Sequence, residues 1–225
     1  MSFQIGASYS SPFTLHSLPL HCSLYGILDT GYVAPTNMGA MAQKLLRGGV
    51  DIIQLRAKNS SEEEIMAMAQ QILPWTRAAQ VPFIINDYPH LVPLTGADGT
   101  HIGQEDMSVS EARALAGEKA LIGLSTHSLK QATEAILQKP DYIGFGPLFA
   151  TPTKPTYLPI GISDIRKVYL NIPFPVFCIG GITLETLPQV IEAGAKRVVI
   201  VSTLLKAEDP EQTTRQVKTM LTAPC

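Results

Sequence analysis

The sequence predicts an α/β protein, a single (β/α)8 TIM barrel with an N-terminal extension. Short β-branched apolar runs alternate along the chain with longer stretches that have helical spacing. The runs are continuously apolar, as in parallel strands buried on both faces, and about eight strand–helix units close most naturally into a barrel. A doubly wound open sheet is the alternative, but no GxGxxG motif follows the first strand, which weakens a dinucleotide-binding interpretation.

The expected strands are, in order, SLYGIL, DIIQL, PFIIN, GTHI, LIGLS, YIGF, PVFCI and RVVIV. The expected helices cover residues 36–47, 61–79, 89–95, 108–116, 128–138, 162–170, 184–193 and 202–220. Glycines end three of the helices in RGGVD, TGADG and EAGAKR, as in connections that recur around a barrel. Residues 1–21 are rich in Ser and Pro with weak periodicity, so we expect a loosely packed extension before a catalytic barrel domain of residues 22–225.

Composition narrows the class of function. The 225 residues are 45% hydrophobic and carry a net charge of −2, which allows a full core but no broad basic face for nucleic acid. Three cysteines are too few for a disulfide framework, and Cys178, within PVFCIGG, is expected to be a buried, inert thiol. No apolar run approaches a bilayer-spanning length and no signal peptide is recognisable, so we expect a cytoplasmic protein that binds a small polar ligand.

Function in a barrel of this kind resides at the carboxyl ends of the strands. In QLRAK, after the second strand, Gln54, Arg56 and Lys58 are expected on one face of an extended segment, because strand side chains alternate. Two cations and an amide there suit a highly charged anion such as a diphosphate. A solvated strand end is the simpler alternative.

Two aspartates follow the next two strands. Asp87 and Asp106 are each, taken alone, typical of a helix N-cap or a turn. Taken together they suggest Mg²⁺, which is usually held by one or two carboxylates and substrate phosphates. Asn86, beside Asp87, could orient the same phosphates.

The last two strands end in CIGGIT and VIVSTL. Gly180, Gly181, Val201 and Ser202 are therefore candidates for a monophosphate site, since glycine lets backbone N–H groups approach an anion and a helix N-terminus attracts it. Tight packing is the alternative explanation for the glycines. After the sixth strand, the loop ATPTKPT carries hydroxyls and a lysine between two prolines that restrict its backbone.

The histidines are weaker candidates. His127 could touch a substrate near Ser125, and His101 is equally suited to support neighbouring loops. The histidines lack zinc-like spacing, and no GxSxG nucleophile motif is present, so covalent catalysis is not indicated.

Seven motifs, QLRAK, INDY, GADGTHIGQEDM, IGLSTHS, DYIGFGPLFATPTK, IGGIT and VVIVS, together resemble the thiamine-phosphate synthase family, in order from about Leu24 to Ala207. The resemblance implies transfer of a pyrimidinylmethyl group from its diphosphate to a thiazole phosphate, through a stabilised carbocation. It also implies a Mg²⁺ cofactor, small-molecule partners, no nucleic acid or membrane partner, and a homodimer as a family-level expectation.

The same resemblance assigns the site residues. The pyrimidine diphosphate would be held by Gln54, Leu55, Arg56, Ala57, Lys58, Asn86, Ser125 and Lys154. The thiazole phosphate would be held by Thr151, Pro152, Thr153, Gly181, Val201 and Ser202, and Mg²⁺ by Asp87 and Asp106. Arg56, Lys58, Ser125 and Lys154 would be catalytic.

The chain departs from the family pattern at Ala57, where Glu is common, at Ser108 in place of Pro, and in the LDTG that ends the first strand. None of these changes removes an expected ligand. The thiazole tautomerase branch of the family and a non-catalytic phosphometabolite sensor remain alternatives, although neither needs the full set of cations and carboxylates. A triose-type isomerase would need a general-base glutamate, for which Glu105 is a weak candidate.

Overall fold

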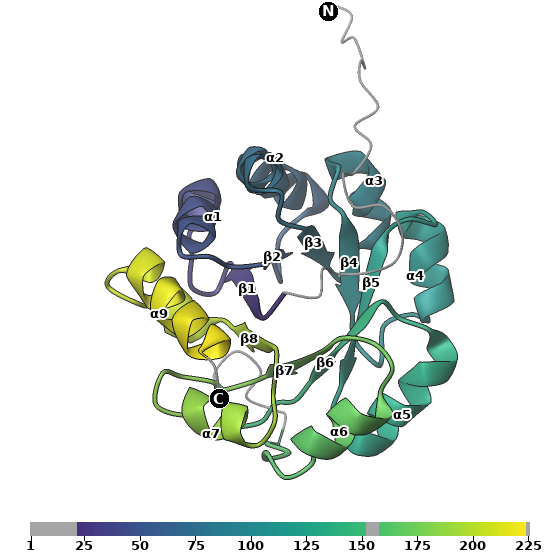
Figure 1. Ribbon diagram of the computed structural model, residues 1–225. Coiled ribbons are helices and arrows are strands. Elements are labelled where there is room, and N and C mark those ends of the chain that lie inside the picture. Colours follow the sequence, from purple (N-terminus) through teal and green to yellow (C-terminus); the bar gives the residue numbers. More distant parts are fainter. Residues whose placement is uncertain (1–21, 152–157, 224–225) are drawn as a thin grey trace, which may run out of the picture.

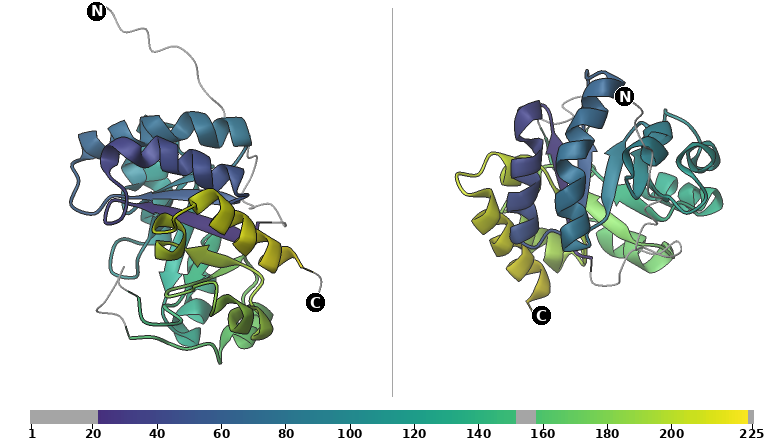
Figure 2. Two further views of the ribbon diagram at one scale, coloured as in Figure 1. Left: turned by 90° about the vertical axis from the view of Figure 1, so that its left-hand side faces the viewer. Right: turned by 90° about the horizontal axis from the view of Figure 1, so that it is seen from above.

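The computed structural model describes residues 22–151 and 158–223, which form a closed barrel of eight parallel strands. Each strand pairs with the next in chain order, and β8 pairs with β1, so this sheet has no edge. Helices form a ring outside the strands (Figure 1). Figure 2 shows the same arrangement from the side and from above. The closed barrel confirms the predicted fold and excludes the open sheet. The N-terminal extension lies outside the described residues.

The strands are β1 Leu24–Asp29, β2 Ile52–Arg56, β3 Phe83–Asn86, β4 Gly99–Ile102, β5 Leu121–Thr126, β6 Tyr142–Phe145, β7 Val176–Ile179 and β8 Val198–Ile200. The helices are α1 Met38–Arg47, α2 Glu62–Ala79, α3 Val92–Thr95, α4 Val109–Ala116, α5 Leu129–Gln138, α6 Ile165–Asn171, α7 Leu187–Glu192, α8 Ser202–Leu205 and α9 Pro210–Thr222. Two 3-10 turns, η1 Pro35–Asn37 and η2 Pro89–Leu91, precede α1 and α3. Among the described helices, none is long and apolar enough to cross a membrane.

The eight expected strands agree with the structure to within one residue at each end. The single helix predicted for residues 202–220 is wrong, because the chain forms α8 and α9 separately. Asp209 ends the connection between them by accepting a hydrogen bond from the Gln212 backbone N–H at 3.0 Å, and Pro210 occupies the first position of α9. An N-cap followed by proline is a strong start signal for a new helix.

Two of the helices begin at serine capping boxes. Ser61 before α2 and Ser108 before α4 each accept a hydrogen bond from a backbone N–H three residues later. The glutamates at those later positions, Glu64 and Glu111, accept hydrogen bonds from the serine backbone N–H groups in return. This reciprocal pairing fixes where each helix starts. Ser108, which departs from the family pattern, therefore has a structural role.

The hydrophobic core has two parts. One cluster fills the inside of the barrel and includes Tyr25, Tyr142 and Phe177. The other cluster lies between the strands and the helices, where each strand presents its outward side chains. Because both faces of every strand are buried, the strands are continuously apolar rather than alternating.

Carboxylates anchor the amino ends of three strands to the helices outside. Asp98, before β4, accepts a hydrogen bond from the Phe83 backbone N–H at 2.8 Å and pairs with Arg77 of α2 at 2.7 Å. Asp141, before β6, forms a similar ion pair with Arg113 of α4, with a nitrogen–oxygen distance of 2.9 Å. Asp51 and Lys218 repeat it before β2, and Lys218 lies on the helix that closes the ring beside α1 (Figure 1). These ion pairs stabilise the amino-terminal end of the barrel, which is the end opposite the candidate site described below.

We predict that Asp98→Ala lowers the free energy of unfolding by about 3 kcal/mol, because it leaves the Arg77 guanidinium and the Phe83 N–H without their buried partner. Glu134→Ala, which removes an exposed ion pair with Lys130, is the control and should cost no more than about 0.5 kcal/mol. Denaturant unfolding of the two variants measures both values. Equal losses would show that the buried pairs are not anchors.

Candidate active site

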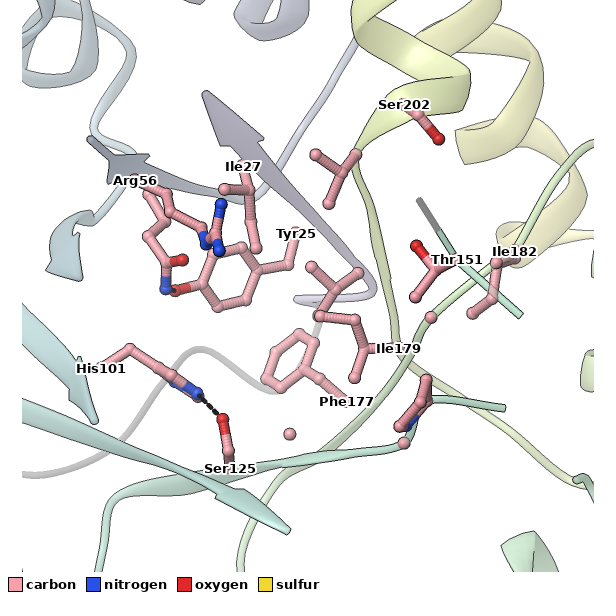
Figure 3. Close-up of a pocket in the computed structure, with 18 of the residues that line it drawn as sticks. Tyr25, Ile27, Arg56, His101, Ser125, Thr151, Phe177, Ile179, Ile182 and Ser202 are labelled. Carbon is pink, nitrogen blue, oxygen red and sulfur yellow. Dashed lines mark hydrogen bonds between the residues drawn. The ribbon is translucent and has the colours of Figure 1, made fainter. Parts of the chain in front are cut away.

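A cavity of about 210 Å³ opens at the carboxyl ends of the strands, and every strand contributes to its lining. Figure 3 shows Arg56 on one side and Thr151 and Ser202 on the other. Apolar side chains, including Ile27, Phe177 and Ile179, lie between them. The cavity thus has a cationic side and a hydroxyl-bearing side, separated by a surface on which flat rings can pack.

Arg56 is held by a buried carboxylate from the neighbouring strand. Its guanidinium donates to Asp29 at 2.5 Å, and the side chains are 13% and 4% exposed, respectively. Asp29 also accepts from the Gly31 backbone N–H at 2.8 Å, so its own position is fixed by the turn after β1. Arg56 lines the cavity. The carboxylate therefore lies behind the cation and fixes the direction in which its remaining N–H groups can point.

The three polar residues of QLRAK do not all share one extended segment. β2 ends at Arg56, so Gln54 and Arg56 belong to the strand and line the cavity, whereas Lys58 lies in the turn that follows. The prediction of a single face is therefore wrong for Lys58. Its ammonium group instead lies 3.0 Å from Asp87 at the end of β3. Leu55 and Ala57 are buried on the other side of the chain.

The two predicted metal ligands have different surroundings. Asp87 is partly buried and paired with Lys58. Asp106 is exposed on the loop after β4, where its carboxylate accepts from the Gly103 backbone N–H at 2.6 Å. Asp106 lines a separate shallow depression together with Glu105. Asp106 thus has the turn role that its sequence position also suggested.

Asn86 and Ser125 both line the cavity, as expected for residues that end β3 and β5. Ser125 Oγ lies 2.9 Å from Nε2 of His101, as Figure 3 shows. His101 is therefore part of the cavity and contacts a predicted substrate residue, which sequence reasoning missed. His127 also lines the cavity, and its Nδ1 lies 2.6 Å from the Gly146 carbonyl oxygen.

The glycine pair at the end of β7 combines both explanations that the sequence left open. Gly180 and Gly181 have φ values of 98° and 65°, which favour glycine. A side chain at Gly181 would also meet the Ala150 carbonyl oxygen at 2.5 Å, because the loop after β6 passes directly over it. Both glycines also line the cavity. They are required by the close approach of two loops and also expose backbone to the cavity.

The other residues predicted for the thiazole phosphate that can be placed are Thr151, Val201 and Ser202, and all three line the cavity. Thr203 in α8 donates to the Ile182 carbonyl oxygen at 2.9 Å, which ties α8 to the loop after β7. Pro152, Thr153 and Lys154 lie outside the described residues.

The buried cysteine in β7 confirms the sequence prediction. Cys178 is fully buried, and burial raises the pKa of its thiol to about 12. The thiol stays protonated at neutral pH and is therefore unreactive.

Comparison with known proteins agrees with this geometry. The family model described as thiamine monophosphate synthase matches residues 24–204. A thiamine-phosphate synthase of Thermus thermophilus is 41% identical over 80% of this chain and 86% of its own length. A thiamine-phosphate synthase from Synechococcus sp. WH7803 is 45% identical over 79% of this chain. That match covers 50% of the relative's own length.

Solved structures give the same result. A thiamine phosphate pyrophosphorylase from Pyrococcus furiosus superposes with a TM-score of 0.81 at 28% identity, covering 89% of this chain and 96% of its own. A 3-hexulose-6-phosphate synthase, with a TM-score of 0.65 at 15% identity, shares the fold alone. Because the family model covers most of the sequence and several relatives exceed 30% identity over most of their length, the chain belongs to the thiamine monophosphate synthase family.

Proposed function

We propose that the protein is a transferase that makes thiamine phosphate. It would move the 4-amino-2-methyl-5-pyrimidinylmethyl group from its diphosphate to 4-methyl-5-(2-phosphooxyethyl)thiazole and release diphosphate. If the acceptor is the carboxylated form of that thiazole, CO2 would leave as well and a proton would take its place on the ring. The observation that carries the proposal is a single cavity with Arg56 on one side and Gly181 and Ser202 on the other. Two phosphorylated rings need such an arrangement, and the family relationship points to the same reaction.

The reaction breaks the bond between the pyrimidinylmethyl carbon and the diphosphate oxygen, and the electron pair leaves with the diphosphate. The thiazole nitrogen then uses its lone pair to form the new carbon–nitrogen bond. No proton has to be removed in either step, so cations matter more than a base. Arg56 can donate two parallel hydrogen bonds to the departing diphosphate, while Asp29 keeps its guanidinium in place. Lys58 and, from the family resemblance, Lys154 would add positive charge.

Asp87 and Asp106 are the residues that would hold Mg²⁺. Within residues 22–151 and 158–223, no three His, Cys, Asp or Glu side chains are grouped to form a complete metal site. A two-carboxylate site fits Mg²⁺, which takes its other ligands from substrate phosphates and water. Bound there, the ion would neutralise charge on the departing diphosphate. Lys58 balances the Asp87 carboxylate from the other side at 3.0 Å.

The thiazole phosphate would lie against the loops after β6, β7 and β8. Gly181 and Val201 can offer backbone N–H groups, and Thr151 and Ser202 carry hydroxyl groups. Because α8 has only four residues, these individual groups matter more than a helix macrodipole. From the family resemblance, Pro152 and Thr153 would complete this side. The ring would pack on Ile182 and the apolar wall.

The pyrimidine would lie on the opposite side, against Gln54, Leu55, Ala57, Asn86 and Ser125. Gln54, Asn86 and Ser125 carry polar groups on the lining of the cavity. Leu55 and Ala57 would contribute through backbone groups, since their side chains pack into the core outside the barrel. From family membership and composition, the proposal extends to a cytoplasmic enzyme that works as a homodimer.

We expect the purified protein to convert the pyrimidine diphosphate and the thiazole phosphate into thiamine phosphate and diphosphate when Mg²⁺ is present. A chelator should abolish turnover and added Mg²⁺ should restore it, because without the metal the two carboxylates would add negative charge beside the departing diphosphate. Chromatographic detection of thiamine phosphate measures the reaction. Absence of product from folded protein with intact substrates would refute the proposed function, and full activity in chelator would refute the metal assignment.

We predict that Asp29→Asn lowers kcat/KM for the pyrimidine diphosphate about tenfold, because Arg56 loses the charged partner that orients it. The KM for the thiazole phosphate should not change. Combining Asp29→Asn with Arg56→Ala should add little to Arg56→Ala alone, since Asp29 acts through Arg56. Steady-state kinetics measure these values.

Asp164→Asn, at an exposed pair with Lys167, is the matched control and should leave the kinetics unchanged. Additive losses in the double variant would mean that Asp29 acts on substrate by another route.

A further inference from the structure

A continuous chain of hydrogen bonds crosses the inside of the barrel. Nε2 of Gln54 donates to the Tyr25 hydroxyl at 2.8 Å, and the Tyr25 and Tyr142 hydroxyls are 3.0 Å apart. The Tyr142 hydroxyl lies 3.3 Å from Nδ1 of His101, and Nε2 of His101 lies 2.9 Å from Ser125 Oγ. All five residues line the cavity. The chain therefore joins two residues proposed to bind the pyrimidine through three that are not assigned to it.

The strand between His101 and Tyr142 leaves space for their contact. Gly123 of β5 faces both rings, and a methyl group at this position would overlap the Tyr142 ring and Nδ1 of His101. The two rings have their centroids 5.6 Å apart. The contact between His101 and Tyr142 thus requires glycine at position 123. The hydrogen-bond chain therefore depends on the packing of three neighbouring strands.

The proton positions along this chain depend on one another. Tyr25 accepts from Gln54, so its single proton is left for Tyr142. Tyr142 then accepts from Tyr25 and donates its own proton to Nδ1 of His101. A neutral imidazole with an accepting Nδ1 carries its proton on Nε2, which donates to Ser125. The Ser125 hydroxyl proton is consequently directed to another acceptor, and the adjoining space is the cavity.

Reversing one end would reverse the whole chain. If the Gln54 amide turned over, its oxygen would accept from Tyr25, and each later bond would change direction until Ser125 donated to His101. Both phenols keep their protons in either case, because burial raises the pKa of Tyr25 and Tyr142 above its usual value. The donor or acceptor character of Ser125 is therefore coupled to the orientation of the Gln54 amide.

Building on the proposed function, we propose that Tyr25 and Tyr142 are positioning residues that hold Gln54 and Ser125 in complementary hydrogen-bonding states. The Gln54 amide nitrogen is turned toward Tyr25, which leaves its carbonyl oxygen as the acceptor for an amino group. At the other end, Ser125 presents a hydroxyl donor to a ring nitrogen or a diphosphate oxygen. An aminopyrimidine that carries a diphosphate has this combination of donor and acceptor.

The first test is kinetic. Tyr142→Phe removes one hydroxyl and keeps the ring, so the fold should persist while the chain is interrupted. We expect the KM for the pyrimidine diphosphate to rise about tenfold and the KM for the thiazole phosphate to stay the same. Tyr25→Phe should behave alike, and the double variant should lose little more than either single variant.

Tyr169→Phe is the matched control. The Tyr169 hydroxyl is partly buried, but it donates to the Val176 carbonyl oxygen on the outside of the barrel, at 2.7 Å. This variant should lose stability without a change in either KM. Additive effects of the two barrel variants, or equal effects on both substrates, would overturn the coupling.

The second test does not depend on activity. Long-range ¹⁵N–¹H NMR spectra of histidine-labelled protein near pH 8, assigned with His101→Gln, report which imidazole nitrogen carries the proton. We expect an unprotonated Nδ1 and a protonated Nε2 at His101, and a loss of that clear preference in Tyr142→Phe. A proton on Nδ1 in the unmodified protein would overturn the proposed direction.

The two tests can fail separately. If the unmodified protein makes no thiamine phosphate but His101 shows the expected tautomer, the proposed function fails and the hydrogen-bond chain stands. If product forms and the tautomer is unchanged in Tyr142→Phe, the proposed function stands and the coupling is wrong.

Discussion

Closure of the eight parallel strands is the constraint on which the rest of the molecule depends. Because all strands run in the same direction, their carboxyl ends meet at one rim and their amino ends at the other. Asp51, Asp98 and Asp141 form ion pairs with residues of the surrounding helices, and these pairs stabilise the amino-terminal rim. The carboxyl-terminal rim can therefore hold functional residues, as is usual in this fold, in which the amino-terminal face serves stability.

Charge at the functional rim is balanced in pairs. Arg56 is held by Asp29, and Lys58 by Asp87, so each cation already has a carboxylate beside it. Such pairing keeps long, flexible side chains in one geometry, which is what a leaving diphosphate needs from its receptor. The same principle applies inside the barrel, where hydrogen bonds instead of charges join Gln54 to Ser125 through Tyr25, Tyr142 and His101.

The sequence was sufficient for the fold and for most of the rim. Strand ends could be read from the apolar runs, and most of the site residues predicted from them line the cavity. Among the predicted site residues in the described part of the chain, those that do not line it are Leu55, Ala57, Lys58, Asp87 and Asp106. Asp29 and Tyr142 could not be recognised in this way, because each acts through a partner more than twenty residues away, which only strand pairing brings close. The role of Gly123 could not be recognised from the sequence either, since this glycine leaves space for side chains of two neighbouring strands.

A crystal structure with thiamine phosphate, diphosphate and Mg²⁺ bound tests the account most directly. The account predicts diphosphate within hydrogen-bonding distance of Arg56, with the metal at Asp87 and Asp106, and the thiazole phosphate against Gly181 and Ser202. The pyrimidine ring should lie between Gln54 and Ser125. Phosphate groups bound outside the cavity, or the two phosphate sites exchanged, would contradict it.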